Sequence, residues 1–272
     1  MSFANFKPTI WAKVIETELK QKCILVDHCN QNFEGEPKYG NRVKIVGAVA
    51  PEVFDYIQTE GLGEPQIPDA FDAYIDIDQQ KAYNFMVDDI DKAQINPNFQ
   101  SVYLAEAAYK MAAARDKYVA SLAAKAPEGQ IIGGEAITTT KAAKALIDEA
   151  LLKLREADVD YSQNVRIEVS HKFYQLFRDA LVELKTNNDS LIAKGIVGMY
   201  DNCKVVNTNH LHNDGTDTYM MVRTNKAIGF ASCLDETEAY RSHKYFSDVL
   251  RGLNVFGANI VRPKELVVVK FH

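Results

Sequence analysis

One stretch of the sequence constrains the fold more than any other: residues 41–87 alternate polar and apolar side chains on both sides of a glycine- and proline-rich turn. Alternation of this kind is typical of half-buried β-strands. The two glycines and two prolines within residues 60–68 predict the turn at the tip. An isolated hairpin is only marginally stable in water, and one this long cannot bury both faces against itself. We therefore expect a long two-sided β-hairpin that needs a further surface, such as an adjacent subunit.

The longest expected helix covers residues 96–125. Asn96 can cap its start and Pro97 suits its first turn, while Pro127 and Gly129 end it. At 1.5 Å per residue the helix would be about 40 Å long, which exceeds the core of a small domain. It is expected to act as a spine that links two lobes. Its buried stripe is predicted to be Leu104, Ala108, Met111, Tyr118 and Leu122.

The remaining segments mix helices with short strands. An amphipathic helix over 7–22 carries the only tryptophan, Trp11, which packs either on its own domain or on a neighbouring subunit. Helical spacing predicts a second helix over 139–157, and Ser170 is a natural cap for a third. Separated helices and short strands indicate an α+β fold. The short strands are expected over 165–169, 195–200, 203–206, 218–222 and 265–270.

Composition limits the class of protein. The 272 residues can form one large domain or two closely joined ones, and a 47% hydrophobic fraction with 25% charged residues is ordinary for a folded protein. A net charge of −6 gives no sign of the basic face that nucleic-acid binding usually requires. No apolar run suggests a membrane span or a signal peptide. The four cysteines, including the Cys23–Cys29 pair beside His28, are expected to be free thiols because their spacing fits no common zinc pattern.

A search for chemistry finds two weak candidates. The sequence holds no phosphate-binding loop, dinucleotide fingerprint or nucleophile elbow. His210 and His212, with carboxylates nearby, could ligate a metal, but a polar turn rich in Asn, Asp and Gly is the favoured interpretation. Asp88, Asp89 and Asp91 could serve acid–base chemistry or hold Mg²⁺, yet a solvated turn or salt bridges between subunits is favoured. We therefore predict no catalytic residue, no cofactor and no metal site, and no enzymatic activity.

The order of several short segments resembles one known family. Taken singly each match is weak, but together they cover nearly the whole chain. They are Ser2–Trp11, Gly40–Ile45, Ile77–Lys81 with Phe85–Gln94, Val165–Leu176, Gly195–Tyr200, and Gly252–Ala258 with Arg262-Pro263. In this order they are similar to the major capsid (coat) proteins of tailed bacteriophages, whose fold is shared with encapsulin shells and the herpesvirus capsid floor.

The resemblance implies a tailed-phage major capsid fold with five parts. These are an N-terminal arm (1–37), an extended β-hairpin loop (38–87, tip at about 58–68), a spine helix with a peripheral domain (88–135), an axial domain with a mixed sheet (136–250), and a C-terminal strand (251–272) that returns to the core.

The same resemblance implies a structural function. Subunits of this kind form hexamers and pentamers that tile the icosahedral head of a tailed phage around double-stranded DNA, without sequence-specific DNA binding. The protein would be a virion component assembled in the host cytoplasm, with separate scaffolding, portal and decoration proteins as further partners. One alternative is an encapsulin-type nanocompartment shell, and another is a metal-dependent enzyme that uses His210 and His212.

Charged and loop residues are the candidates for contacts between subunits. The three aspartates at 88, 89 and 91 are expected to pair with arginines of a neighbour, and the loop tip is expected to contact a neighbour as well. The candidates are Trp11, Arg42, Gly61, Gly63, Lys81, Asp88, Asp89, Asp91, Arg115, Arg251 and Arg262.

Overall fold

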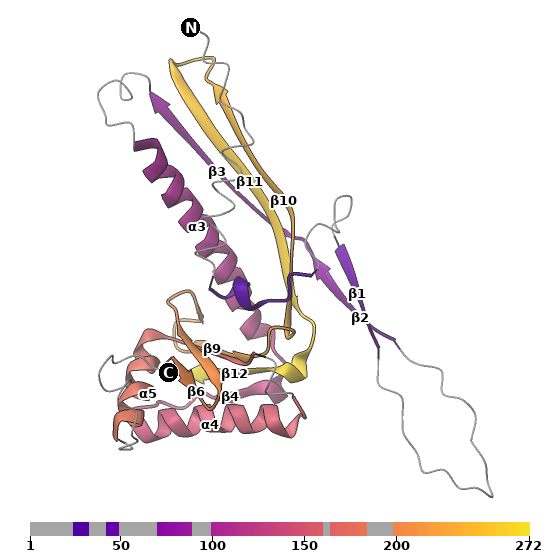
Figure 1. The fold of residues 1–272 in the computed structure, drawn as a ribbon, viewed down its shortest axis with the longest axis vertical. Helices are drawn as coiled ribbons and strands as arrows, with labels where there is room; N and C mark the ends of the chain where they lie inside the picture. Colours follow the sequence, from indigo (N-terminus) through magenta and orange to yellow (C-terminus); the bar gives the residue numbers. More distant parts are fainter. Residues whose placement is uncertain (1–23, 33–41, 49–69, 89–98, 160–163, 184–197) are drawn as a thin grey trace, which may run out of the picture.

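The computed structural model describes residues 24–32, 42–48, 70–88, 99–159, 164–183 and 198–272 (Figure 1). They form an elongated part and a layered part, with a two-stranded hairpin projecting from the side. The elongated part, called here the peripheral domain, is helix α3 (Phe99–Ser121) with a three-stranded sheet. The layered part, called the axial domain, is a seven-stranded sheet with helices α4 (Thr140–Glu156) and α5 (His171–Glu183).

The peripheral sheet consists of long antiparallel strands in the order β10-β11-β3. They are β3 (Gln79–Asp88), β10 (Ile228–Arg241) and β11 (Ser247–Ile260). Helix α3 lies along one face of this sheet (Figure 1). Phe85 and Leu250 are paired in register and belong to the core on the α3 side, whereas the next pair along, Met86 and Val249, lies on the opposite face.

The spine prediction is confirmed in outline. Helix α3 is described from Phe99 onward and continues into a 3₁₀ turn, η2 (Leu122–Lys125), while the predicted start at Asn96 and Pro97 lies outside the described residues. Its 23 residues span about 35 Å. Most of the predicted stripe is buried, and only Tyr118 is partly exposed because its hydroxyl reaches a polar partner.

Two sequence-based boundaries differ from the structure. The projecting hairpin pairs β1 (Arg42–Ala48) with β2 (Ala70–Asp76), so the expectation of one hairpin running to residue 87 is wrong: β3 leaves it and pairs with β11. Residues 228–250 were expected in the axial domain, but they pair beside β3 in the peripheral sheet. Both differences arise from the peripheral sheet. It is built on β10 and β11, two long strands that the sequence did not predict.

The axial sheet is mixed and buried on both faces. Strands β12 (Leu266–Phe271) and β9 (Thr218–Arg223) lie at its centre. Phe173 and Phe177 of α5 and Ile147 of α4 pack against one face, while Met221 and Val268 face the core shared with α3. Burial on both faces explains the nearly continuous apolar sequences of β9 and β12. The other strands are β4 (Ile131–Gly133), β5 (Arg166–Val169), β6 (Met199–Tyr200), β7 (Cys203–Asn207) and β8 (His212–Asn213).

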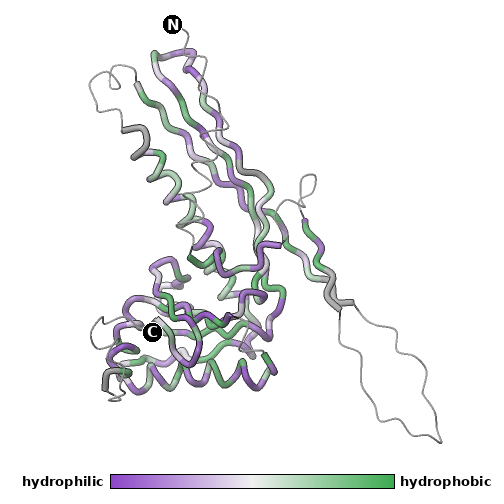
Figure 2. The backbone as a smooth tube through the Cα atoms, in the orientation of Figure 1, coloured by the Kyte–Doolittle hydropathy of each residue, from purple (hydrophilic) through white to green (hydrophobic). Residues whose placement is uncertain are grey.

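Local signals set the starts of the axial helices. The Thr139 hydroxyl accepts the N–H of Ala142 at the start of α4, and the Ser170 hydroxyl accepts the N–H of Phe173 at the start of α5. Figure 2 shows apolar and hydrophilic residues alternating along α4, as expected for a helix with one face on a sheet. Short 3₁₀ turns complete the described elements: η1 (Val26–His28), η3 (Glu128–Gln130) and η4 (Pro263–Glu265). Within the described ranges, none of the helices has the length and apolar character that a bilayer crossing requires.

Candidate assembly site

The projecting hairpin is joined to the body at its base by apolar packing on the peripheral sheet. Ile75 of β2 and Ile77 just beyond it pack with Val43 of β1 against Ala231 of β10, and Val255 of β11 borders this cluster. The described strands of the hairpin point away from α3 and from the axial domain (Figure 1). The body therefore supports the hairpin through a small base.

A glycine makes this close approach possible. A Cβ atom at Gly257 of β11 would lie 2.8 Å from the carbonyl carbon of Asp76 and 2.9 Å from the Cα of Ile77. Both atoms belong to backbone, so no side-chain rearrangement could relieve the overlap. Two residues further along β11, the Asn259 side-chain amide donates to the carbonyl of Tyr74 at 2.7 Å. These contacts fix the position of the hairpin on β11.

Polar contacts support the same base from the spine. The Tyr118 hydroxyl on α3 donates to Asp78 at 2.9 Å, in the link between β2 and β3. Burial and this hydrogen bond raise the pKa of Tyr118, so the hydroxyl stays protonated as a donor. On the exposed side, the Arg42 guanidinium pairs with Asp76 across the hairpin and lies over the Tyr74 ring.

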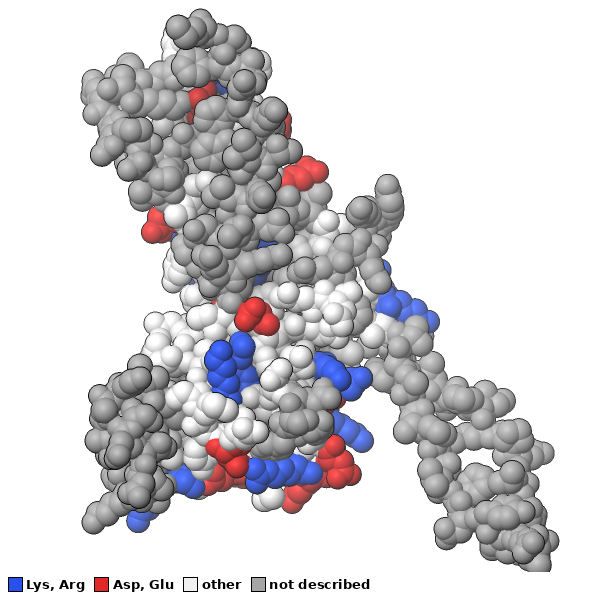
Figure 3. Space-filling view, viewed as in Figure 1, with Lys and Arg blue, Asp and Glu red and all other residues white. Residues whose placement is uncertain are grey.

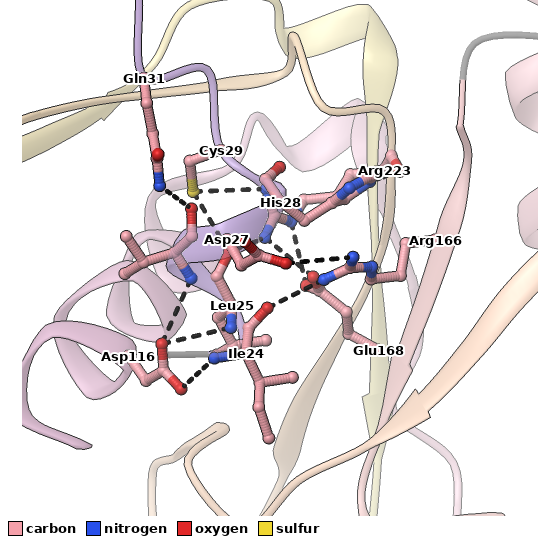
Figure 4. A network of polar contacts seen from close by, with 11 residues as sticks. Ile24, Leu25, Asp27, His28, Cys29, Gln31, Asp116, Arg166, Glu168 and Arg223 are labelled. Carbon is pink, nitrogen blue, oxygen red and sulfur yellow. Dashed lines mark hydrogen bonds and ion pairs between the residues drawn. The ribbon is translucent and has the colours of Figure 1, made fainter. Parts of the chain in front are cut away.

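A second polar site lies where residues 24–30 pass between α3 and the axial sheet (Figure 4). We call it the N-terminal clamp, made of Asp116, Arg166, Glu168 and Arg223 around that segment. Glu168 and Arg223 are fully buried and form a two-pronged ion pair, with distances of 2.8 and 3.0 Å. Burial alone would lower the pKa of Arg223, but the charge of Glu168 raises it, so the guanidinium is charged.

Two groups within the clamp are held neutral. Burial, with the nearby charges of Arg223 and Arg166, lowers the pKa of His28 to about 3. Its Nε2 lies 3.3 Å from the carbonyl oxygen of Arg223 and donates to it in the neutral form. Burial raises the pKa of Cys29 to about 11, so this free thiol is a packing residue, as the sequence predicted.

The neutral His28 gives the subunit a pH-dependent stability. In the unfolded chain His28 binds a proton below about pH 6.5, but in the fold it does not until about pH 3. The unfolded state therefore binds more protons across this range, and stability falls as the pH falls. Between pH 6.5 and 5 we expect the free energy of unfolding to drop by up to about 2 kcal/mol from this group.

Urea unfolding at pH 7 and pH 5 measures this effect. The variant His28→Gln keeps a side-chain donor but cannot titrate, so it should lack that part of the pH dependence. Equal pH dependence in the wild type and the variant would contradict the assignment.

The loop that carries His210 and His212 contains a hydrogen-bonded turn. The Asp214 carboxylate accepts the backbone N–H groups of Asp217 and Thr216, at 2.7 and 2.9 Å, and these bonds lower the pKa of Asp214 to about 2. His212 lies against the Tyr219 ring, and His210 points elsewhere, to within 3.5 Å of Asp116. No group of three or more metal-ligating side chains occurs in the part of the chain that the structure describes. The geometry favours the polar-turn interpretation.

The predicted contact residues fall into three groups. Some of them lie outside the described residues, namely Trp11, Gly61, Gly63, Asp89 and Asp91. Asp88 is the last residue of β3. Lys81 is exposed on β3. Each of the four arginines has a partner in its own subunit, and Arg115 is buried, donating to Asn254 at 2.9 Å. Arg42, Arg251 and Arg262 are exposed and pair with Asp76, Glu238 and Glu265 respectively.

Arg115 is thus a core residue of its own subunit, because α3 packs it against the Phe230 and Phe256 rings. The exposed pairs of Arg42, Arg251 and Arg262 each contribute little to stability in water. Whether Asp88, Asp89 and Asp91 pair with arginines of a neighbouring subunit stays a prediction.

Charges of both signs share the surface. Figure 3 shows acidic and basic side chains interspersed over the face that carries α4. Two ion pairs involve α4, the half-buried pair of Lys144 with Asp148 and the exposed pair of Arg155 with Asp201. Mixed charges of this kind favour specific contacts of modest strength over broad attraction to one kind of polymer.

Comparison with known proteins places this arrangement. No family model matches the chain, and no curated protein sequence matches it. Solved structures do match along almost the whole length. A structure from Mycobacterium phage Che8 is 26% identical with a TM-score of 0.75, and covers 91% of this chain and 90% of its own. The capsid of cyanophage P-SCSP1u is 18% identical with a TM-score of 0.74, over 92% and 88%.

A virus-like particle from Pyrococcus furiosus is also similar, at 10% identity and a TM-score of 0.61, over 96% of this chain and 98% of its own. Its sequence identity and its TM-score are both lower than those of the two phage structures. The fold of this chain is therefore shared with the phage structures over nearly its full length. The resemblance predicted from the sequence is confirmed, and the chain has the fold of the tailed-phage major capsid proteins.

Proposed function

We propose that the chain is a major capsid protein that self-assembles into the icosahedral head of a tailed phage. The observation that carries this proposal is the match to phage structures over about nine-tenths of both chains. A partial match could reflect one shared module, but a match of this extent covers most of the fold. The function of such a fold lies in its surfaces, and its localisation is the virion capsid.

The hairpin gives this function a physical basis. A two-stranded ribbon is marginal alone in water. Among the described residues, the apolar support that β1–β2 receives from its own subunit is a small cluster around Val43, Ile75 and Ile77. Packing on a neighbouring subunit supplies the missing surface. Shell subunits also need many weak contacts so that wrong contacts can dissociate, and exposed ion pairs worth about 0–1 kcal/mol each meet that need.

The finer composition of the shell follows as part of the proposal. Hexamers and pentamers of the subunit enclose double-stranded DNA, which is retained by the closed shell and not by base-specific contacts. The net charge of −6 and the mixed surface of Figure 3 support a container over a DNA-coating protein. Scaffolding, portal and decoration proteins are separate partners, and the chain itself catalyses no reaction.

An encapsulin-type compartment is the second candidate, since the fold is shared. The lower similarity to the archaeal particle disfavours it. The contents of purified particles separate the two functions: a phage head produced with its packaging proteins holds DNA, whereas a compartment holds a cargo enzyme.

Size-exclusion chromatography and negative-stain microscopy of the expressed protein test the proposal. The protein should form capsomer rings or closed shells, alone at high concentration or when produced with the proteins encoded beside it. A discrete small oligomer under both conditions would contradict a shell function.

A further inference from the structure

Residues 24–30 occupy a slot between the two domains. The side chains of Leu25, Val26 and Cys29 are buried in the core that α3 shares with the axial sheet. At the end of the segment, Asn30 pairs with β10, donating to Ile228 at 2.8 Å and accepting from Phe230 at 3.0 Å. Apolar burial of this kind is enough to hold a segment in place, but it leaves the orientation of the backbone loosely defined.

From the α3 side, a single carboxylate binds the backbone. Asp116 is fully buried and accepts the N–H groups of Ile24, Leu25 and Val26 at 3.1, 3.2 and 3.2 Å. These amides lead into the short turn η1, and the first N–H groups of such a turn have no carbonyl partner within it. His210 of the axial domain also approaches this carboxylate, at 3.5 Å. Asp116 therefore connects α3 with both residues 24–26 and the axial domain.

From the axial side, two arginines bind the carbonyl groups of the same segment. Arg223 donates to the carbonyls of Leu25 and His28 at 2.7 and 2.8 Å. Arg166 donates to the carbonyl of Ile24 at 2.9 Å. Glu168 holds the Arg223 fork in place from β5. Figure 4 shows these side chains converging on the segment from α3 and from the sheet.

The hydrogen bonds of Asp116, Arg166 and Arg223 to residues 24–28 just described go to main-chain atoms. Two weaker contacts reach side chains of the segment: Arg223 lies 3.5 Å from the Cys29 sulfur, and Arg166 lies 3.9 Å from the Asp27 carboxylate. Peptide groups bound on both their N–H and C=O sides by buried charges have one permitted orientation, whereas apolar side chains alone would permit several. Buried ion pairs contribute little net stability compared with apolar packing, and their best-attested role is to specify one arrangement. The clamp therefore has the properties of a positioning device.

We propose that Asp116 and Arg223 are positioning residues that fix the path and direction of the main chain at residues 24–30, and that uniform shells require this fixed path. The second half of this statement rests on the proposed shell function. The first half concerns the subunit alone and is tested on it separately.

Two variants test the clamp, and two further variants are controls. Asp116→Asn keeps the size of the side chain but turns an amide N–H toward backbone donors. Asp116→Ala removes every acceptor. Leu25→Met is the matched control, since it alters the buried side chain of the same segment by a volume-conserving change and leaves its main-chain contacts in place. Asp148→Asn controls for the loss of a carboxylate elsewhere, as Asp148 binds Lys144 and Tyr200 on the far side of the axial domain.

Hydrogen exchange of the soluble subunit is the first measurement. In Asp116→Asn the amides of residues 24–26 should exchange roughly tenfold to a hundredfold faster, because charge-assisted bonds to them are lost. Amides of β12 should be unchanged. Both controls should match the wild type. Unchanged protection of residues 24–26 in both Asp116 variants would overturn the proposal, and so would a loss of protection spread evenly over the fold in Asp116→Asn.

Microscopy of the particles is the second measurement. Wild type and both controls should give particles of one size, whereas the Asp116 variants should give mixed sizes, tubes or open sheets. Particles of normal uniformity from Asp116→Ala, with faster exchange at residues 24–26, would refute the requirement in assembly. A wild type that forms no shells under any condition would instead refute the proposed function, and the exchange result would still decide the role of the clamp.

Discussion

Replacing Arg223 with methionine will lower the free energy of unfolding of the subunit by about 3–5 kcal/mol. Glu168 is fully buried, and the change leaves its charge without a counter-ion. The carbonyls of Leu25 and His28 also lose their donor. Methionine occupies a similar volume, so the loss reflects charge and hydrogen bonding and not an empty cavity.

A double-mutant cycle identifies the cause. Adding Glu168→Met to Arg223→Met removes the unpaired carboxylate, and should recover part of the loss because two apolar residues replace a buried ion pair. Recovery should be incomplete, since the two carbonyls still lack a donor. Urea unfolding with linear extrapolation measures each variant.

The matched control is Arg262→Met. Arg262 pairs with Glu265 at 2.9 Å, but its side chain is half-exposed. Removal of such a pair should change the free energy of unfolding by less than about 1 kcal/mol. If Arg223→Met lowered the free energy of unfolding by no more than Arg262→Met does, the buried ion pair would not stabilise the fold as expected.

Replacing Gly257 with valine will abolish shell formation while leaving most of the subunit folded. The added Cβ would overlap the backbone of Asp76 and Ile77, so the base of the hairpin must move away from β11. Overpacking of this kind typically lowers stability by about 1–3 kcal/mol. The larger effect falls on assembly, because every hairpin in the shell would leave its subunit at an altered angle.

Gly198→Ala is the control for this variant, since a Cβ at Gly198 meets no atom within 4 Å. It should assemble as the wild type does. Circular dichroism and thermal unfolding report the fold of Gly257→Val, and negative-stain microscopy reports its assembly. Normal shells from Gly257→Val would show that the hairpin base tolerates displacement.

Local sequence signals predicted the elements that depend on neighbouring residues. The apolar stripe of α3, the start of α4 near Thr139, the cap Ser170, and the strands β9 and β12 were all found where expected, within a few residues. In each case the periodicity or the cap is complete within one segment, so nothing distant is needed to recognise it.

The two longest strands were missed because distant residues define them. Strand β10 contains Asp235, Glu236 and Glu238, and β11 contains Gly252 and Gly257, residues that are unfavourable in isolated strands. Their extended form comes from pairing with each other and with β3, far away in the sequence. Without them, β3 was wrongly added to the hairpin.

The clamp was missed for a related reason. Arg166-Ile167-Glu168 alternates polar and apolar residues as a half-buried strand does, so the local pattern gives no sign that Glu168 is buried. Both faces of β5 are in fact covered, and the partner Arg223 lies 55 residues away. The only local sign is the arginine that ends the apolar run of β9.

Because the hairpin is attached at a narrow base, a small rotation there produces a larger displacement at its far end. Strand β1 has seven residues, or about 23 Å of extended chain. A rotation of about 10° at the contact between Gly257 and Asp76 therefore shifts the far end of β1 by about 4 Å. A movement of that size is close to the spacing between adjacent strands, so the curvature of a whole shell is sensitive to one backbone contact inside each subunit.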